Sequence, residues 1–193
     1  KAVYGLRESP ALWGEERDRT LRNLTWSVNN TRYHLEQCTG DSQVWYIRKE
    51  GESTRTGHMV RGVLVVYVDD FLLQMSLGDV RNGLLAAILE TGWKLAKDAM
   101  LEVGNPITFL GIDIYKLQNG DLKLYQERFT DSLLSKHGTE SGTSIRSVQM
   151  GPLPTEPDVP SLTVLRQLQG YSGEFNWLAT RTRPDISYYT SVL

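Results

Sequence analysis

Two adjacent carboxylates, Asp69 and Asp70, are the residues whose types and spacing most directly suggest chemistry. They interrupt an apolar stretch: residues 63–67 read VLVVY before the acids, and residues 71–73 read FLL after them. The unbroken β-branched and aromatic run predicts a strand buried on both faces, and the second run predicts its returning partner. The two acids would then lie where a rigid hairpin reverses, with their charges close together.

Paired carboxylates on a rigid hairpin suit divalent cations. Mg²⁺ prefers hard oxygen ligands and is usually held by one or two carboxylates plus substrate phosphates. In a two-metal site, such ions clamp the attacking and leaving oxygens of a phosphoryl transfer. The alternative interpretation is structural, because Asp is a common turn residue whose side chain bonds nearby backbone. The acids alone leave both interpretations open.

Composition bounds the class of protein. The chain has 193 residues, of which 40% are hydrophobic and 23% charged, as in globular domains. No apolar run approaches a membrane span, no secretory signal opens the chain, and the single cysteine, Cys38, excludes an internal disulfide. We therefore expect an intracellular protein. A net charge of −2 argues against a strongly electrostatic, sequence-blind nucleic-acid binder, although a local basic patch could still hold a template.

The elements that position the acids can be predicted from patterning. Ser9-Pro10 is a typical helix start, so a helix is expected from there to near Trp26, followed by an exposed connection over residues 27–41. Residues 44–47 and 59–67 should form a hairpin that reaches the acids. Residues 78–93 have apolar side chains at helical spacing and predict an amphipathic helix.

The second half of the chain alternates strand and helix signals. Residues 107–115 predict a strand interrupted by Gly111, and Asn119-Gly120 predicts a hairpin turn before a returning strand. A short helix should follow and end at Gly138. After a Ser-, Thr-, Gly- and Pro-rich linker, a final helical stripe is expected. Its members are Val164, Leu168, Tyr171, Phe175 and Leu178.

Five short motifs occur in an informative order. They are Tyr4-Gly5-Leu6 with Ser9-Pro10 and Trp13, Tyr67-Val68-Asp69-Asp70, Phe109-Leu110-Gly111-Ile112, residues 120–138, and Thr182-Arg183-Pro184-Asp185-Ile186. In this order the chain resembles the reverse transcriptase of copia-type long-terminal-repeat retrotransposons. The resemblance spans nearly the whole chain.

The resemblance implies an α+β fold with an antiparallel palm-type sheet and helices on one face. It implies a partial palm with a remnant of fingers over residues 1–115, a thumb-like segment over 116–138, a linker over 139–160, and a helical connection toward a ribonuclease H domain over 161–193. Residues 63–73 and 107–115 are expected to share the sheet.

The resemblance also implies site residues and partners. Asp69 and Asp70 would be catalytic ligands of Mg²⁺ or Mn²⁺. The remaining assignments are Tyr67, Gly5, Ser9 and Pro10 for the nucleotide and template pocket, and Phe109, Leu110 and Gly111 for the primer grip. Implied partners are an RNA template, a DNA primer, deoxynucleoside triphosphates and the other polyprotein domains, with no membrane. The implied location is a cytoplasmic particle or the nucleus.

Two departures keep alternatives open. Arg7-Glu8 stands where the family often has Lys-Gln, and the family's first catalytic Asp is expected upstream of Gly5-Leu6. A catalytically inactive transposon remnant that acts as a structural or interaction module is therefore the main alternative. An unrelated α+β domain with Asp-Asp in a turn would require the motif order to be chance.

Overall fold

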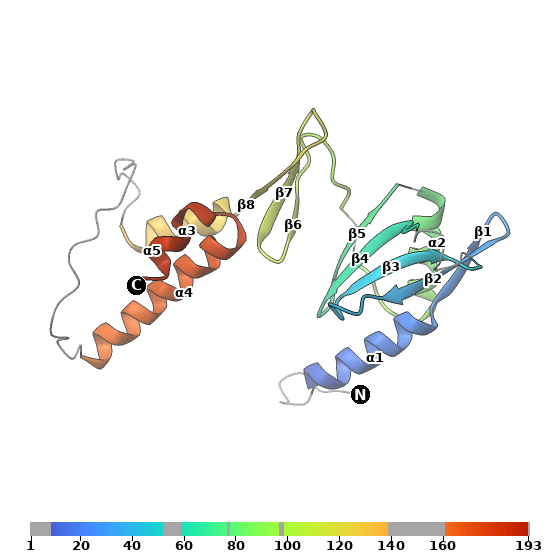
Figure 1. Cartoon of the computed structure of the whole chain (residues 1–193), viewed down its shortest axis with the longest axis horizontal. Coiled ribbons are helices and arrows are strands. Elements are labelled where there is room, and N and C mark those ends of the chain that lie inside the picture. The colour runs from blue at the N-terminus through green and yellow to red at the C-terminus, as the bar shows by residue number, and fades with distance from the viewer. Residues whose placement is uncertain (1–8, 52–58, 77, 97–98, 139–160, 193) are drawn as a thin grey trace. The chain divides into compact units, whose positions relative to one another are not determined.

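The computed structural model describes residues 9–51, 59–76, 78–96, 99–138 and 161–192 (Figure 1). Gly5 and the expected linker over residues 139–160 lie outside the described residues. The fold is mixed α+β, as predicted, and it divides into two compact units, Lys1–Asp98 and Ala99–Leu193. Each unit is described by itself. This division does not test the expected functional boundaries at residues 115, 138 and 160, which stay predictions.

The first unit is a five-stranded antiparallel sheet with two helices. Its elements in order are α1 (Ser9–Asn23), β1 (Thr25–Val28), β2 (Thr31–Gln37), β3 (Val44–Lys49), β4 (Gly62–Tyr67), β5 (Asp70–Met75) and α2 (Gly78–Glu90). The strands lie in the sheet in sequence order, so each one pairs with its neighbour in the chain. The predicted helices after Pro10 and Gly78 and the predicted return of the chain over residues 71–73 are confirmed.

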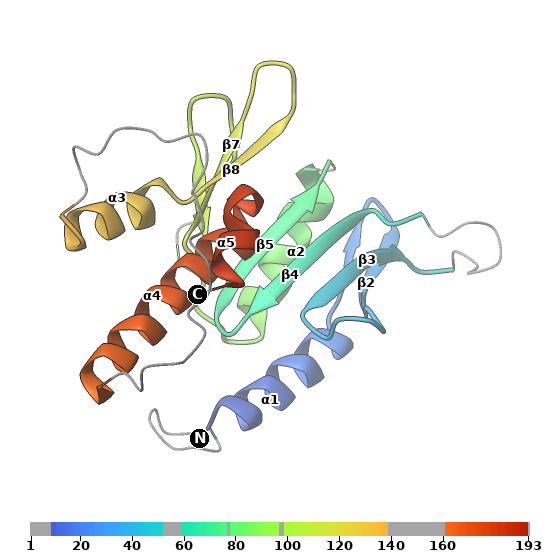
Figure 2. The ribbon, with the colours of Figure 1, turned by 60° about the vertical axis from the view of Figure 1, so that its left-hand side comes forward.

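Both helices contribute to one core on one face of the sheet, and Figure 2 shows α2 lying across that face. The core members come from α1 through α2, and they are Leu21, Leu24, Trp26, Tyr33, Leu35, Trp45, Ile47, Leu64, Val66, Val80, Leu84, Ala87 and Ile88. On β4, Leu64 and Val66 are buried, whereas Val63 and Val65 are half-buried. The expectation that this strand is buried on both faces was therefore wrong. In an antiparallel sheet covered on one side, only alternate residues reach the core.

The segment over residues 27–41 was also predicted wrongly. Instead of an exposed connection it contains the end of β1, a tight turn, and all of β2. The turn residues Asn29 and Asn30 have positive φ values of 49° and 60°, the conformation of the two-residue turns that join hairpin strands. Asn tolerates this conformation, so an Asn-Asn pair followed by alternating Tyr33 and Leu35 was a readable hairpin signal.

The second unit contains a small three-stranded antiparallel sheet and helices. Its elements are β6 (Ile107–Phe109), β7 (Ile112–Lys116), β8 (Leu122–Tyr125), α3 (Glu127–Lys136), α4 (Leu162–Arg181), a 3₁₀ turn η1 (Pro184–Ile186) and α5 (Ser187–Thr190). The predicted returning strand and the helix ended by Gly138, whose φ is 65°, are confirmed. The predicted helix over the final stripe is confirmed as well, but of its five stripe residues only Leu178 is buried.

Residues 107–115 do not form one interrupted strand. Leu110 and Gly111, with φ values of 52° and 76°, form a two-residue turn between β6 and β7. The expectation that this segment shares a sheet with residues 63–73 was wrong as well, because β6, β7 and β8 form a separate sheet. An apolar run with one internal Gly fits both a kinked strand and a short hairpin, so periodicity alone did not separate them.

Candidate metal-binding hairpin

The turn between β4 and β5 presents the two acids. Tyr67, the last residue of β4, pairs with Asp70, the first residue of β5, so the two turn residues are Val68 and Asp69. The prediction that both acids lie in the turn is therefore corrected: the turn lies one residue earlier in the chain. Asp69 lies in the turn, and Asp70 opens the returning strand.

The pairing register places Asp70 and Tyr67 on the face of the sheet opposite the core. Directly paired residues share a face and successive residues alternate, so Tyr67 and Asp70 lie on the face opposite the buried Val66. Tyr67 is 44% exposed, and both acids are exposed. Among the described residues, Tyr67 and both acids are thus exposed at the end of this face, whereas α1 and α2 pack on the opposite face.

The turn carries backbone strain at Val68. Its φ is 53°, a left-handed conformation that a β-branched residue rarely adopts and that costs about 1–3 kcal/mol. Trp13 on α1 donates a hydrogen bond from Nε1 to the carbonyl oxygen of Val68, over 2.9 Å. This bond joins α1 to the turn.

An aromatic cluster connects three segments of the first unit. The Trp13 and Trp93 rings lie 5.6 Å apart, and the Phe71 and Trp93 rings lie 6.1 Å apart, each pair in a tilted arrangement. Such arrangements are favourable between aromatic rings. Phe71 and Trp93 also pack against the main core. The start of α1, the start of β5 and the segment after α2 are thereby joined next to the turn.

The two carboxylates are available to a cation. Neither Asp69 nor Asp70 forms an ion pair or side-chain hydrogen bond with another described residue. Exposed carboxylate oxygens without a partner fit Mg²⁺ or Mn²⁺ as ligands. However, the described residues contain no cluster of three or more His, Cys, Asp or Glu side chains that could hold a metal. The hairpin therefore fits part of a metal site.

The other predicted site residues are distributed over both units. Ser9 is half-buried and Pro10 is exposed, and both lie in the first turn of α1, in the same unit as the hairpin. Gly5 lies outside the described residues. The predicted primer-grip residues belong to the second unit, where Phe109 ends β6 and Leu110 and Gly111 form the turn.

Trp13 is the residue whose contact with the site was missed. The sequence placed it in a motif but gave it no role. An indole N–H in the first turns of an exposed helix signals a polar partner, since buried or half-buried Trp usually finds one. The identity of that partner, 55 residues away in the chain, cannot be read from sequence.

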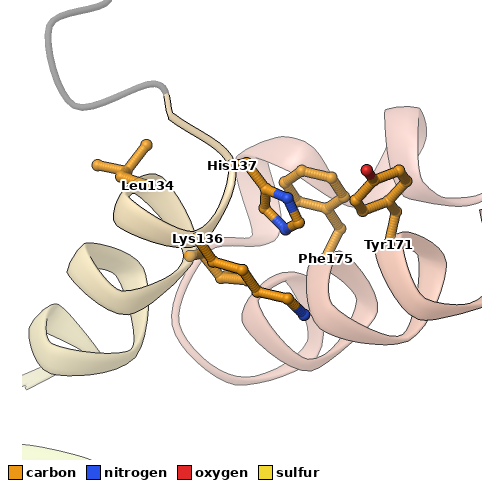
Figure 3. Close-up of a pocket in the computed structure, with 6 residues that line it drawn as sticks. Leu134, Lys136, His137, Tyr171 and Phe175 are labelled. Carbon is orange, nitrogen blue, oxygen red and sulfur yellow. The ribbon is translucent and has the colours of Figure 1, made fainter. Parts of the chain in front are cut away.

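The second unit has a different concavity, a groove of about 480 Å³ where the end of α3 meets α4 (Figure 3). The His137 ring meets Tyr171 edge-on at 4.8 Å, and Glu174 bonds both Lys136 and His137. These bonds lower the pKa of the Glu174 carboxyl below its ordinary value, chiefly through Lys136. Because its charges are already paired, this groove fits a helix-to-helix contact better than a reaction site.

Comparison with curated proteins finds a transposon relative. The chain is 26% identical over 196 residues to a Ty5-1 transposon protein of Saccharomyces cerevisiae, a match covering 99% of this chain and 55% of the yeast protein. The chain is distantly homologous to a transposon protein. It spans about half the length of that curated relative. No family model matches the chain, and no solved structure matches it significantly.

Among the described residues, no helix is both long enough and apolar enough to cross a membrane.

Proposed function

We propose that this chain is part of the reverse transcriptase of a retrotransposon polyprotein, an RNA-directed DNA polymerase that adds nucleotides to a primer 3′ hydroxyl. The observation that carries the proposal is the hairpin. It presents two carboxylates that have no partner among the described residues, at the end of a sheet whose opposite face is closed by a core. The distant relation to a transposon protein over 99% of the chain supports the same origin.

The residues of the hairpin have separate roles in this proposal. Asp69 and Asp70 would hold Mg²⁺ or Mn²⁺, and such ions, when bound, stabilise charge on the attacking and leaving oxygens of a phosphoryl transfer. Tyr67, on the same face as Asp70, would bound the position of the primer terminus and the incoming nucleotide. Nucleotidyl transfer depends mainly on positioning and electrostatics, so a hairpin supported by a packed core suits it.

The face of the sheet opposite the core would receive the nucleic acid. Next to Tyr67 and Asp70 it presents Val65 and Leu72, which pair with each other and are half-buried. Ser9 and Pro10 would border the nucleotide pocket, and Phe109, Leu110 and Gly111 would contact the primer. The ligands of the proposal are accordingly an RNA template, a DNA primer and deoxynucleoside triphosphates.

One observation favours a second function, that of an inactive structural or interaction module. A two-metal site needs further ligands, and the described residues bring no third acidic or imidazole group to the two acids. The polymerase proposal therefore requires an additional carboxylate beside Asp69 and Asp70. The alternative requires none.

Primer extension separates the two. The chain is incubated with an RNA template, a labelled DNA primer, deoxynucleoside triphosphates and Mg²⁺. Extension that falls to background in the Asp69→Asn and Asp70→Asn variants supports the polymerase. Extension that survives both changes overturns the role of these acids, and a wild-type chain that binds Mg²⁺ at neither acid and extends nothing supports the inactive module.

A further inference from the structure

We propose that Trp13 is a positioning residue for the hairpin, and that its indole N–H holds the strained turn in the conformation that presents Asp69 and Asp70. This inference rests on the proposed metal-binding role of those acids. It assigns a role to a side chain on α1 that forms no hydrogen bond with either carboxylate. The structural basis is the bond from Trp13 Nε1 to the Val68 carbonyl oxygen, over 2.9 Å.

The bond is made to the residue of the turn whose backbone conformation is strained. Val68 has a φ of 53°, and valine has no intrinsic preference for that conformation. Left to itself, the turn would relax toward negative φ at this position. An observed backbone outlier persists when its surroundings impose it, and such outliers concentrate at functional sites.

The bonded atom also fixes the direction of the next residue. The Val68 carbonyl belongs to the planar peptide unit that joins Val68 to Asp69. Orienting that oxygen therefore orients the plane from which the Asp69 backbone and side chain continue. Asp70 follows as the first paired residue of β5, so its position depends on the same reversal.

Trp13 is itself held in place, so that it can act as an anchor. Its ring packs at 5.6 Å on Trp93, which in turn packs on Phe71 and the core. Its helix continues to Leu21, which is fully buried in that core. The Trp13 indole thereby connects the turn to the buried core of the first unit.

The test uses Mn²⁺ alone as the probe, titrated into the full chain and followed by calorimetry. Trp13→Phe keeps an aromatic ring but removes the N–H donor. We expect it to weaken Mn²⁺ binding by about threefold, the size expected for one partly solvated hydrogen bond, while the thermal unfolding temperature changes little. Trp93→Phe is the matched control, because it keeps an aromatic ring for Trp13 to pack on, and Trp93 forms no hydrogen bond with Val68 among the described residues; its Mn²⁺ affinity should be unchanged.

A second variant tests the mechanism through the strain. Glycine adopts positive φ without steric cost, so Val68→Gly makes the turn independent of its anchor. In the V68G background, adding W13F should therefore cost little or no Mn²⁺ affinity. Equal losses with and without V68G, an unchanged affinity in W13F, or the same loss in W93F would each overturn the positioning role.

The failure of the metal-binding proposal can be told apart from the failure of this inference. If the wild-type chain binds no Mn²⁺, the proposed function of the acids fails in this chain. The turn is then followed directly by nuclear magnetic resonance, using the backbone coupling constants that report φ at Val68. A Val68 φ that moves to negative values in W13F but not in W93F supports the positioning role, and an unchanged φ in W13F overturns it.

Discussion

The two compact units bury their apolar side chains to very different degrees. The main buried cluster lies entirely in the first unit, where α1 and α2 cover one face of the five-stranded sheet. Among the described residues of the second unit, the buried apolar side chains are Leu133, Leu178 and Ala179. Its longest helix, α4, exposes every residue from 162 to 171.

This difference matches what each unit is proposed to do. Precise placement of carboxylates requires a hairpin supported by close packing, since interiors resist displacement. A unit proposed to contact nucleic acid or other domains can leave apolar side chains outside until a partner covers them. The unit with the dense core carries Asp69 and Asp70, and the sparsely packed unit carries the predicted primer-grip residues.

The largest expected effect comes from making the same substitution on a helix of each unit. Leu84 on α2 is fully buried, whereas Leu168 on α4 is 41% exposed. Leu84→Ala should destabilise the first unit by about 2–5 kcal/mol, because it removes buried methyl groups and leaves a cavity. Leu168→Ala should change stability by about 0.5 kcal/mol or less.

Urea unfolding followed by amide hydrogen exchange in each unit measures both effects. Similar losses in the two variants would contradict the difference in packing between the units.

Replacing one helix glycine in each unit by alanine should change stability less than Leu84→Ala does. The two changes should have opposite signs. A Cβ added at Gly83 on α2 would lie 2.7 Å from Cδ1 of Trp26, a buried ring that also bonds the Val80 carbonyl oxygen over 3.1 Å. Gly83→Ala should therefore destabilise by about 1–2 kcal/mol, since overpacking exceeds the gain in helix propensity.

A Cβ added at Gly173 on α4 would meet nothing within 4 Å. Gly173→Ala should stabilise by about 0.5–1 kcal/mol, through helix propensity alone. Thermal unfolding of both variants measures the signs, and a stabilising Gly83→Ala would show that the α2 packing is loose.

The smallest effect concerns the ion pairs of the second unit. Lys136 and His137 hold the pKa of the Glu174 carboxyl below its ordinary value of 4.5, so the folded state binds that proton less readily than the unfolded state. The stabilisation is therefore present above pH 4.5 and is lost as pH falls through the lowered pKa. Removing the carboxyl should remove this pH dependence.

The free energy of unfolding is measured for wild type and Glu174→Gln between pH 6 and pH 3. The difference between the two proteins should shrink as the pH falls. Glu102→Gln is the control, since the Glu102 carboxylate has no partner among the described residues. A difference between wild type and Glu174→Gln that stays constant with pH would show that the ion pairs do not couple α3 to α4.

Much of the fold was predictable because local signals and tertiary structure agree. Ser9-Pro10 opens α1, and the acids interrupt an apolar hairpin. Two of the failures share one cause, which is that a two-residue turn is too short to interrupt the pattern of the segment around it. Asn29-Asn30 and Leu110-Gly111 both make such turns at positive φ inside segments that read as a loop and as one strand.

The candidate site was predictable in its residues but not in its geometry. The order of motifs singled out Asp69 and Asp70, and the pairing register then placed Asp70 in the strand and Asp69 in the turn. The bond from Trp13 to Val68 depends on how α1 crosses the sheet. That crossing is set by the burial of Leu21 and its partners, which local patterning does not encode.

The central claim is that the two acids of the hairpin bind a divalent cation, and Mn²⁺ titration of three chains tests it most directly. The double variant D69N/D70N removes the exposed pair at the turn. The double variant E15Q/E16Q removes an equal charge from an adjacent, exposed pair on α1. We predict that Mn²⁺ binding is lost in D69N/D70N and kept in E15Q/E16Q; binding that persists in D69N/D70N, or falls equally in both, would contradict the claim.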